Sequence, residues 1–306
     1  MQALSLGIQS VLNGYYASAA HRQALALPDP VPGQPLHFFR AMCHFEPATP
    51  FLNELRSSGF SPRVFRLPDG EESYLLDPWP LTALRAVEHF SRRPEDIGER
   101  PVFVGHSAGG FAVYLLAALA DGADVASYRE VLSGLDLFGV MSPIRAGALR
   151  DLACALSGAL FVSIGTPYAG VEFRRIGHLL NRHFFEPQSP LLLKALQRSY
   201  LDPLYRRLGA KPGRVIHGQM ISPDDPVRIS RNPSSFVYET ILQGGMRLVA
   251  RMTEFDLYDG IAPWSATYVP EMRDREVLAS DHLRMVEDPE PAARLVRLIT
   301  RLKAWV

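Results

Sequence analysis

The feature that most constrains this chain is a glycine-rich corner at residues 101–110, Pro-Val-Phe-Val-Gly-His-Ser-Ala-Gly-Gly. Its first four residues predict a short apolar strand, and 108–120 predicts a strongly apolar helix. Gly105 and Gly109 frame a serine in the pattern G-x-S-x-G, and this pattern lies between the strand and the helix, as its structural role requires. We therefore expect a tight, strained turn that projects the hydroxyl of Ser107 above the edge of a sheet.

The rest of the chain alternates between strand and helix patterns. The predicted strands are 36–42, 63–67, 101–104, 159–164, 214–221 and 248–255. The predicted helices are 51–58, 80–90, 108–120 and 291–305. Strands that alternate with helices imply the α/β class, with a mostly parallel central sheet and helices on both faces.

Length and charge narrow the function classes. The chain has 306 residues, which we interpret as a single domain over 1–306, with an N-terminal helix and linker at 1–34 and a helical cap or lid at 171–212. Lys and Arg number 32 and Asp and Glu also number 32, so the net charge is zero. A balanced charge argues against nucleic acid or an anionic membrane surface as the main partner.

The N-terminus and the cysteines bear on location and cofactors. The first twelve residues are apolar but carry no Lys or Arg, and no apolar run reaches the roughly 20 residues that span a membrane. We expect a cytoplasmic protein without an integral membrane segment; a secretory signal ending near Ala17 stays the alternative. Cys43 and Cys154 are expected to be free and buried, and no phosphate-binding or dinucleotide motif appears, so we expect no cofactor.

Four further segments fall in an order that is familiar from one fold. They are 35–42 (PLHFFRAM), 165–170 (GTPYAG), 259–263 (DGIAP) and 281–283 (DHL). With the corner at Ser107, they resemble the α/β-hydrolase fold, and most of all its bacterial lipase and esterase branch, in which G-H-S-x-G-G is common. The resemblance implies a serine hydrolase with the central sheet described above and a helical cap.

A serine nucleophile needs a base, and the base needs an orienting acid, in the chain order Ser, acid, His. Four histidines follow Ser107. His178 and His183 lie in a predicted surface or lid helix, and His217 lies in a predicted strand as a packed or hydrogen-bonded histidine. His282 lies in a polar loop just before the last helix, which predicts His282 as the base.

The triad acid has more than one candidate. Asp259 is followed by glycine and proline, and its loop resembles the acid loop of the lipases, so Asp259 is the predicted triad acid. Asp225, its neighbour Asp224, and Asp256 remain alternatives.

The oxyanion loop departs from the lipase pattern. One donor is expected to be the N–H of Ala108, directly after the nucleophile. The resemblance places the second donor at Met42, but Arg40 and Ala41 stand where the lipases have His-Gly, so the N–H of Cys43 is the alternative.

Three residues complete the predicted substrate-binding set. Arg40 is interpreted either as a structural guanidinium or as a clamp for a carboxylate or phosphate. His106 and Tyr168 are predicted substrate contacts. No metal site is expected, because Arg284 stands where the related lipases offer a carboxylate to calcium.

Three function classes follow. The first is a serine esterase or lipase acting on a small-molecule or lipid-like acyl substrate with a medium or long chain, because the predicted cap is rich in aromatic residues. The second is an acyltransferase, thioesterase or cyclising offloading enzyme that takes its acyl group from an acyl carrier protein. The third is a catalytically inactive hydrolase fold that only binds.

Overall fold

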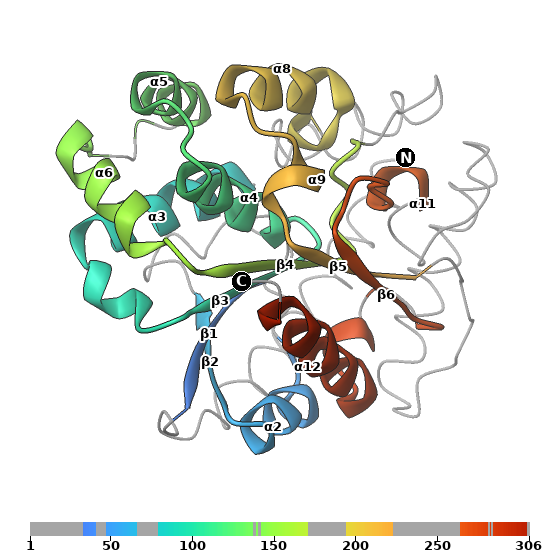
Figure 1. Ribbon diagram of the computed structural model, residues 1–306. Helices are drawn as coiled ribbons and strands as arrows, with labels where there is room; N and C mark the ends of the chain where they lie inside the picture. Colours follow the sequence, from blue (N-terminus) through green and yellow to red (C-terminus); the bar gives the residue numbers. More distant parts are fainter. Residues whose placement is uncertain are drawn as a thin grey trace, which may run out of the picture.

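The computed structural model describes residues 33–40, 47–65, 79–136, 139, 142–170, 194–222, 264–280, 282 and 284–304. Within them, one sheet is formed in the order β2-β1-β3-β4-β5-β6, and every neighbouring pair is parallel (Figure 1). Its strands are β1 Gln34–Phe39, β2 Phe60–Phe65, β3 Val102–His106, β4 Leu160–Ile164, β5 Gly218–Ile221 and β6 Asp274–Val277. The predicted α/β class with a parallel central sheet is confirmed.

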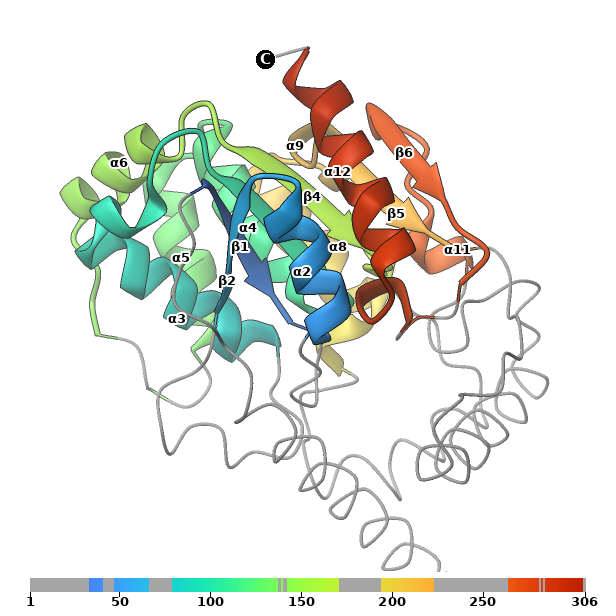
Figure 2. The same ribbon diagram turned by 90° about the horizontal axis from the view of Figure 1, so that it is seen from below.

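Helices cover both faces of this sheet. One face carries α2 Thr49–Ser57 and α12 Pro289–Lys303, which lie side by side (Figure 2). The opposite face carries α3 Trp79–Arg92, α4 Gly109–Ala120, α5 Val125–Leu135, α6 Ala146–Ala155, α8 Arg198–Leu208 and α9 Pro212–Val215 (Figure 1). The shorter elements are α11 Trp264–Thr267 and the 3₁₀ turns η1 Pro94–Ile97, η3 Lys194–Leu196 and η4 Arg284–Val286.

Successive residues of the central strands enter two separate cores. Phe39 and Phe103 pack in the core under α3 and α4, whereas Phe38 and Val104 pack in the core under α2 and α12. This is the period of two that a strand imposes on its side chains. Because both faces are buried, the central strands are apolar throughout, as the sequence of residues 101–104 indicated.

Most predicted elements lie within a few residues of the observed ones. Helices 108–120 and 291–305 correspond to α4 and α12, and strand 159–164 corresponds to β4. The predicted strand at 248–255, the predicted helix within 1–32 and the predicted lid residues 171–193 lie outside the described residues.

The predicted strand at 214–221 is wrong in its first half. Pro212 begins a helical turn, α9, in which the missing N–H of proline leaves no bond unmade, and the N–H of Ile216 donates to the carbonyl of Pro212 at 2.9 Å. The strand begins only at Gly218, so His217 precedes it. Nδ1 of His217 accepts a hydrogen bond from the N–H of Phe161 at 3.1 Å, which agrees with the predicted hydrogen-bonded role.

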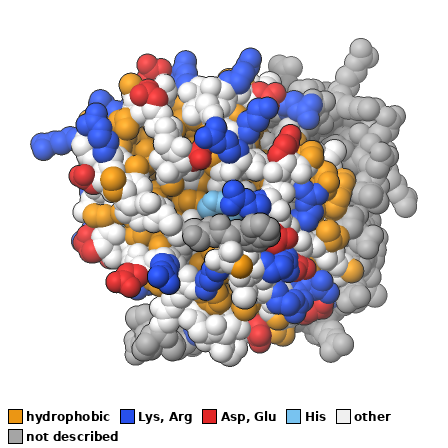
Figure 3. Space-filling model, viewed as in Figure 1, with side chains coloured by type: hydrophobic (Ala, Val, Ile, Leu, Met, Phe, Trp, Pro, Cys, Tyr) orange, Lys and Arg blue, Asp and Glu red, His pale blue; other side chains and the backbone are white. Residues whose placement is uncertain are grey.

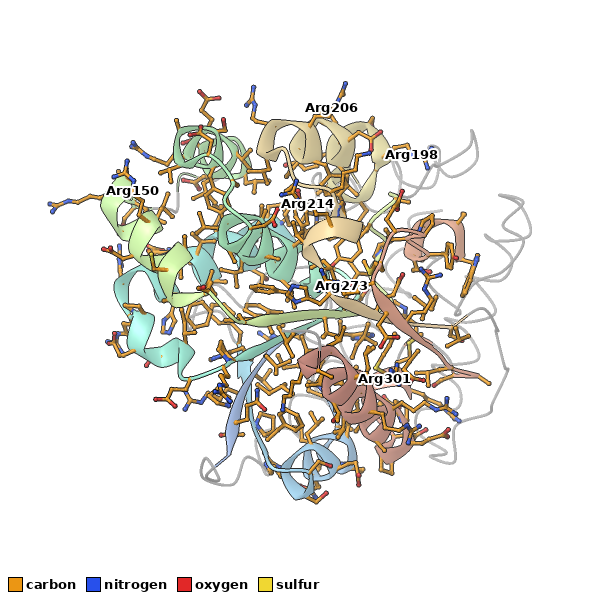
Figure 4. The ribbon with its side chains drawn as sticks, in the orientation of Figure 1. Arg150, Arg198, Arg206, Arg214, Arg273 and Arg301 are labelled. Carbon is orange, nitrogen blue, oxygen red and sulfur yellow. The ribbon has the colours of Figure 1, made fainter. Side chains whose placement is uncertain are left out.

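Strand β6 was not predicted, and its composition explains why. Its four residues, Asp-Arg-Glu-Val, carry no apolar alternation, because the strand lies at the sheet edge. Arg301 of α12 donates to Asp274 at 2.8 Å and to Glu276 at 2.7 Å (Figure 4). Charged side chains of this kind also discourage edge-to-edge pairing with other chains.

The expectation that Cys154 is buried is wrong. The thiol is free and exposed on α6. Leu149 and Leu152, three residues apart, turn the apolar face of this helix to the core, and Cys154 follows two residues later on the outer face. Cys43 lies outside the described residues.

The described end of the predicted cap belongs to the core. In α8, Leu201, Leu204 and Leu208 are buried, and the helix packs beside α5. On the face shown in Figure 3, Lys and Arg side chains are scattered among Asp and Glu side chains. None of the described helices is both long enough and apolar enough to cross a membrane.

Candidate active site

The strand order marks a place for a site. The chain lays down β1, adds β2 on one side of it, and then places β3 on the other side. In a parallel α/β sheet, such a reversal opens a crevice at the carboxyl ends of the two strands. Arg40 follows β1 and Ser107 follows β3, so both residues lie at the carboxyl ends of these two strands.

Ser107 has a strained backbone. Its φ is 52°, and Arg100 is the only other described non-glycine residue with a positive φ. Such a conformation is held at a cost of about 1–3 kcal/mol and occurs mainly at functional turns. The N–H of Ser107 donates to the carbonyl of Ile164 at 2.8 Å, which extends the pairing of β3 and β4 into the turn.

Three glycines permit this turn by close approach. A Cβ added at Gly105 would lie 2.4 Å from Cα of Gly110, and one at Gly109 would lie 2.3 Å from the carbonyl oxygen of Phe39. A Cβ at Gly110 would lie 1.9 Å from Oγ1 of Thr166. Side chains at these three positions would therefore collide with their neighbours, which explains the glycine at each of them.

The loop after β4 holds the start of α4. Tyr168 is 1 % exposed, and its hydroxyl donates to the carbonyl of Gly110 at 2.9 Å. The hydroxyl of Tyr205 donates to the carbonyl of Tyr168, also at 2.9 Å. Burial raises the pKa of Tyr168, so its hydroxyl stays protonated and remains a donor. Through these contacts Tyr168 stabilises the turn at Ser107 and the start of α4. Its predicted contact with substrate stays a prediction.

Ala108 is the N-cap residue of α4 and has helical dihedrals. The first N–H groups of a helix carry partial positive charge and lack intrahelical acceptors, so they favour a developing oxyanion. The N–H of Ala108 lies at this helix start, and its role as an oxyanion donor stays a prediction.

His282 is brought to this corner from the far end of the chain. It is 2 % exposed and precedes η4 and α12. Nε2 of His106, the residue just before Ser107, lies 2.8 Å from the main-chain oxygen of His282. The two imidazole rings have centroids 4.9 Å apart, with planes inclined at 38°.

His106 is fully buried and uncharged. Burial and, to a smaller extent, the nearby His282 lower its pKa from 6.5 to about 3, while the hydrogen bond to the carbonyl of His282 acts in the opposite direction. The predicted contact of His106 with substrate stays a prediction, and the observed contact is with the loop that carries the predicted base.

Arg40 directly follows β1, the strand beside β3, and is 8 % exposed. Its main-chain oxygen lies 2.4 Å from the point that a Cβ on Gly109 would occupy, so β1 and α4 are in close contact here. The Arg40 side chain is thus buried at the carboxyl end of β1. Both roles predicted for it, a structural one and an anion-binding one, stay predictions.

Several predicted site residues lie outside the described residues. They are Met42 and Cys43 of the oxyanion loop, the acid Asp259, and its alternatives Asp224, Asp225 and Asp256. Among the described residues, no three His, Cys, Asp or Glu side chains are grouped as a metal ion requires.

No protein-family model matches the chain, and no curated protein matches it in sequence. Among solved structures, it is similar to the lipase BlEst2 of Bacillus licheniformis in its mature form, with 12% identity and a TM-score of 0.52, over 90% of this chain and 95% of that one. The propeptide form of that lipase gives 11% identity and a TM-score of 0.50, over 90% of this chain and 51% of that one. The fold is that of the α/β-hydrolases.

Ser107 lies on the turn after strand β3, and its role as a nucleophile stays a prediction. Two site features escaped sequence reasoning. The sequence did hold a signal for the packing of Thr166 on Gly110. Gly110 lies outside the G-x-S-x-G pattern, so the pattern does not account for a glycine there, and close packing does. The contact of His106 with His282 had none, since 176 residues separate the two.

Proposed function

We propose that this α/β-hydrolase is a serine hydrolase that cleaves carboxylic ester bonds through an acyl-serine intermediate. The observation that carries the proposal is the strained backbone of Ser107 at the switch point of the sheet, with the buried His282 in contact with the neighbouring His106. The similar structure from Bacillus licheniformis is a lipase, which is consistent with this chemistry.

Four residues have roles in the proposed reaction. Oγ of Ser107 attacks the ester carbonyl while His282 takes the hydroxyl proton, and the N–H of Ala108 stabilises the oxyanion. His282 then protonates the leaving alcohol. Water, activated by the same imidazole, hydrolyses the acyl-enzyme and frees Ser107. Asp259 is the proposed acid that orients His282.

We propose a medium or long acyl chain as the substrate. The support is the aromatic composition of the predicted cap, which includes Phe173, Phe184 and Phe185. A pocket lined by such residues favours an alkyl chain, because burial of each methylene contributes about 0.8 kcal/mol.

An alkyl fluorophosphonate tests the nucleophile directly. We expect the reagent to add one phosphonyl group to the wild-type chain on Ser107, located by peptide mass spectrometry. Ser107→Ala should abolish labelling, and Ser57→Ala, at a helix end far from the crevice, should label like the wild type. Labelling of Ser107→Ala at the wild-type rate would reject Ser107 as the nucleophile.

A series of p-nitrophenyl esters then tests the substrate class. We expect a burst of p-nitrophenol as the acyl-enzyme accumulates, and a kcat/KM that rises from acetate to octanoate. A series that favours acetate would contradict the proposed acyl pocket while leaving the nucleophile in place.

The second candidate function is that of an acyltransferase, thioesterase or cyclising offloading enzyme. It uses the same acyl-enzyme but differs in the donor or the acceptor of the acyl group. Arg40 favours it, because a buried guanidinium at the crevice suits a substrate with a carboxylate or a phosphopantetheine phosphate. Arg40→Gln should then raise KM for an acyl-pantetheine phosphate thioester by about 10–100-fold and leave a neutral ester nearly unchanged. Equal losses for both substrates would assign Arg40 to the loop structure instead.

A further inference from the structure

The histidine before the nucleophile makes a contact that the proposed reaction does not use. Nε2 of His106 lies 2.8 Å from the main-chain oxygen of His282. Because a carbonyl oxygen only accepts, Nε2 must carry the proton. His106 is therefore a donor to the backbone of the loop that presents the predicted base.

The other ring nitrogen of His106 has no such partner. Nδ1 is the bare acceptor of this tautomer, and it is buried without a hydrogen bond to any described residue. An apolar ring of similar shape would fill the same space without burying an unpaired nitrogen. Packing alone is thus a poor reason for a histidine here, whereas donation to the carbonyl of His282 is a sufficient one.

The contact is rigid at the end that His106 provides. His106 is the last residue of β3, and the next residue is the strained Ser107, whose N–H is bonded to β4. The same corner therefore fixes the nucleophile and the donor. The inclined imidazole of His282, with its centroid 4.9 Å away, packs against this fixed ring.

The charge state of His106 suits this place. Burial lowers its pKa to about 3, so the ring is neutral across the usual assay range. A neutral neighbour does not oppose the positive charge that the base acquires during proton transfer.

We propose that His106 is a positioning residue, which holds the main-chain carbonyl and the ring of His282 in line with Ser107. This inference rests on the proposed function, since it assigns His282 as the base. It predicts that loss of the donor at His106 lowers the rate of the chemical step without weakening substrate binding.

Two substitutions separate the donor from the ring. In glutamine, Nε2 is separated from Cβ by as many bonds as Nε2 is in histidine, so His106→Gln keeps the donor. His106→Phe keeps a ring but removes the donor. We expect His106→Phe to lower kcat by about 10–100-fold with KM nearly unchanged, and His106→Gln to stay within about threefold of the wild type.

His37 supplies a matched control. It is also buried, its Nε2 lies 2.9 Å from the carbonyl oxygen of Ile97, and its ring stacks on Phe103. His37→Phe removes the same kind of contact away from the crevice. It should affect thermal stability as His106→Phe does but leave kcat nearly unchanged.

The outcomes are decisive in each direction. Equal kcat for His106→Phe and His37→Phe, measured well below their melting temperatures, would overturn the proposal, as would a His106→Gln variant no better than His106→Phe. If His106→Phe fails to fold, His106→Asn replaces it, because the shorter amide cannot reach the carbonyl of His282. Fluorophosphonate labelling of each variant separates this proposal from the proposed function. If Ser107 is not a nucleophile, the wild type is not labelled on Ser107 either. If only the role of His106 is wrong, the wild type is still labelled on Ser107.

Discussion

The centre of the sheet and its β6 edge both carry polar groups, but they hold them by different means. At the carboxyl end of β3, Ser107 has a positive φ, and the neighbouring His106 is buried and neutral. At β6, Asp274 and Glu276 share the partly exposed guanidinium of Arg301. At the centre, close backbone packing and burial hold the polar residues, and few other side chains would fit there. At the edge, water can solvate the charged groups when an ion pair is lost, so each pair contributes little to stability.

The largest effect is expected at the nucleophile. Ser107→Ala should lower kcat by about 10⁴–10⁶ with little change in folding, because the reaction loses its acyl-enzyme while the turn keeps its shape. Steady-state kinetics and thermal denaturation of the same preparation measure both quantities. More than a few per cent of residual activity would remove Ser107 from its role.

The next effect distinguishes the candidate acids. Asp259→Asn should lower kcat by about 10²–10⁴, since an amide no longer stabilises the charged, correctly oriented base. Asp225→Asn is the control and should leave kcat nearly unchanged. The reverse pattern in paired kinetics would transfer the acid role to Asp225.

Acid should destabilise the protein through His37, which is buried at the centre of the sheet. Burial lowers the pKa of His37 from 6.5 to about 4, so between these values the unfolded chain binds a proton that the folded chain does not. The free energy of unfolding should therefore fall as the pH drops through this window, by up to about 3 kcal/mol from His37, and level off below it. Urea titrations from pH 7 to 4 measure how the free energy of unfolding depends on pH, which gives the number of protons taken up on unfolding. His37→Phe should reduce that number by about one. An unchanged number would show that His37 is not the source of the pH dependence.

Glycine substitutions should separate close approach from ordinary helix propensity. Gly105→Ala should destabilise the fold by about 1–3 kcal/mol and reduce activity, because its Cβ would meet the backbone of Gly110. Gly134→Ala in α5 is the control, because nothing lies within 4 Å of its added Cβ, and it should stabilise by about 0.5–1 kcal/mol. Equal unfolding midpoints in urea would show that the corner has room.

The smallest effect is expected at the edge. Arg301→Ala should lower the free energy of unfolding by under about 1 kcal/mol, because its ion pairs with Asp274 and Glu276 are partly exposed. The loss should shrink in about 1 M salt, which screens such pairs, and kcat should not change. A loss of several kcal/mol would put the edge on the same footing as the centre.

The success of sequence reasoning followed the range of each interaction. The corner at Ser107 was predictable, because strand, turn and helix follow one another within twenty residues and the glycines leave few alternatives. Helix α12 was predictable from the spacing of Leu295, Leu298 and Leu302, which are all buried. Strand β6 was missed because an edge strand has little apolar pattern, and the start of α9 was misread because Val215 and Ile216 suit either structure.

The sequence by itself therefore determined the α/β alternation, the strained serine turn and the residue types for a nucleophile and a base. Those properties depend on local sterics and on apolar periodicity, both of which the order of residues contains. Only the tertiary structure decided that Thr166 packs on Gly110 and that the carbonyl of His282 meets His106 across 176 residues. Such contacts depend on how the crossover connections bring loops that are far apart in the sequence to the same end of the sheet. A local sequence pattern does not indicate which of these loops meet.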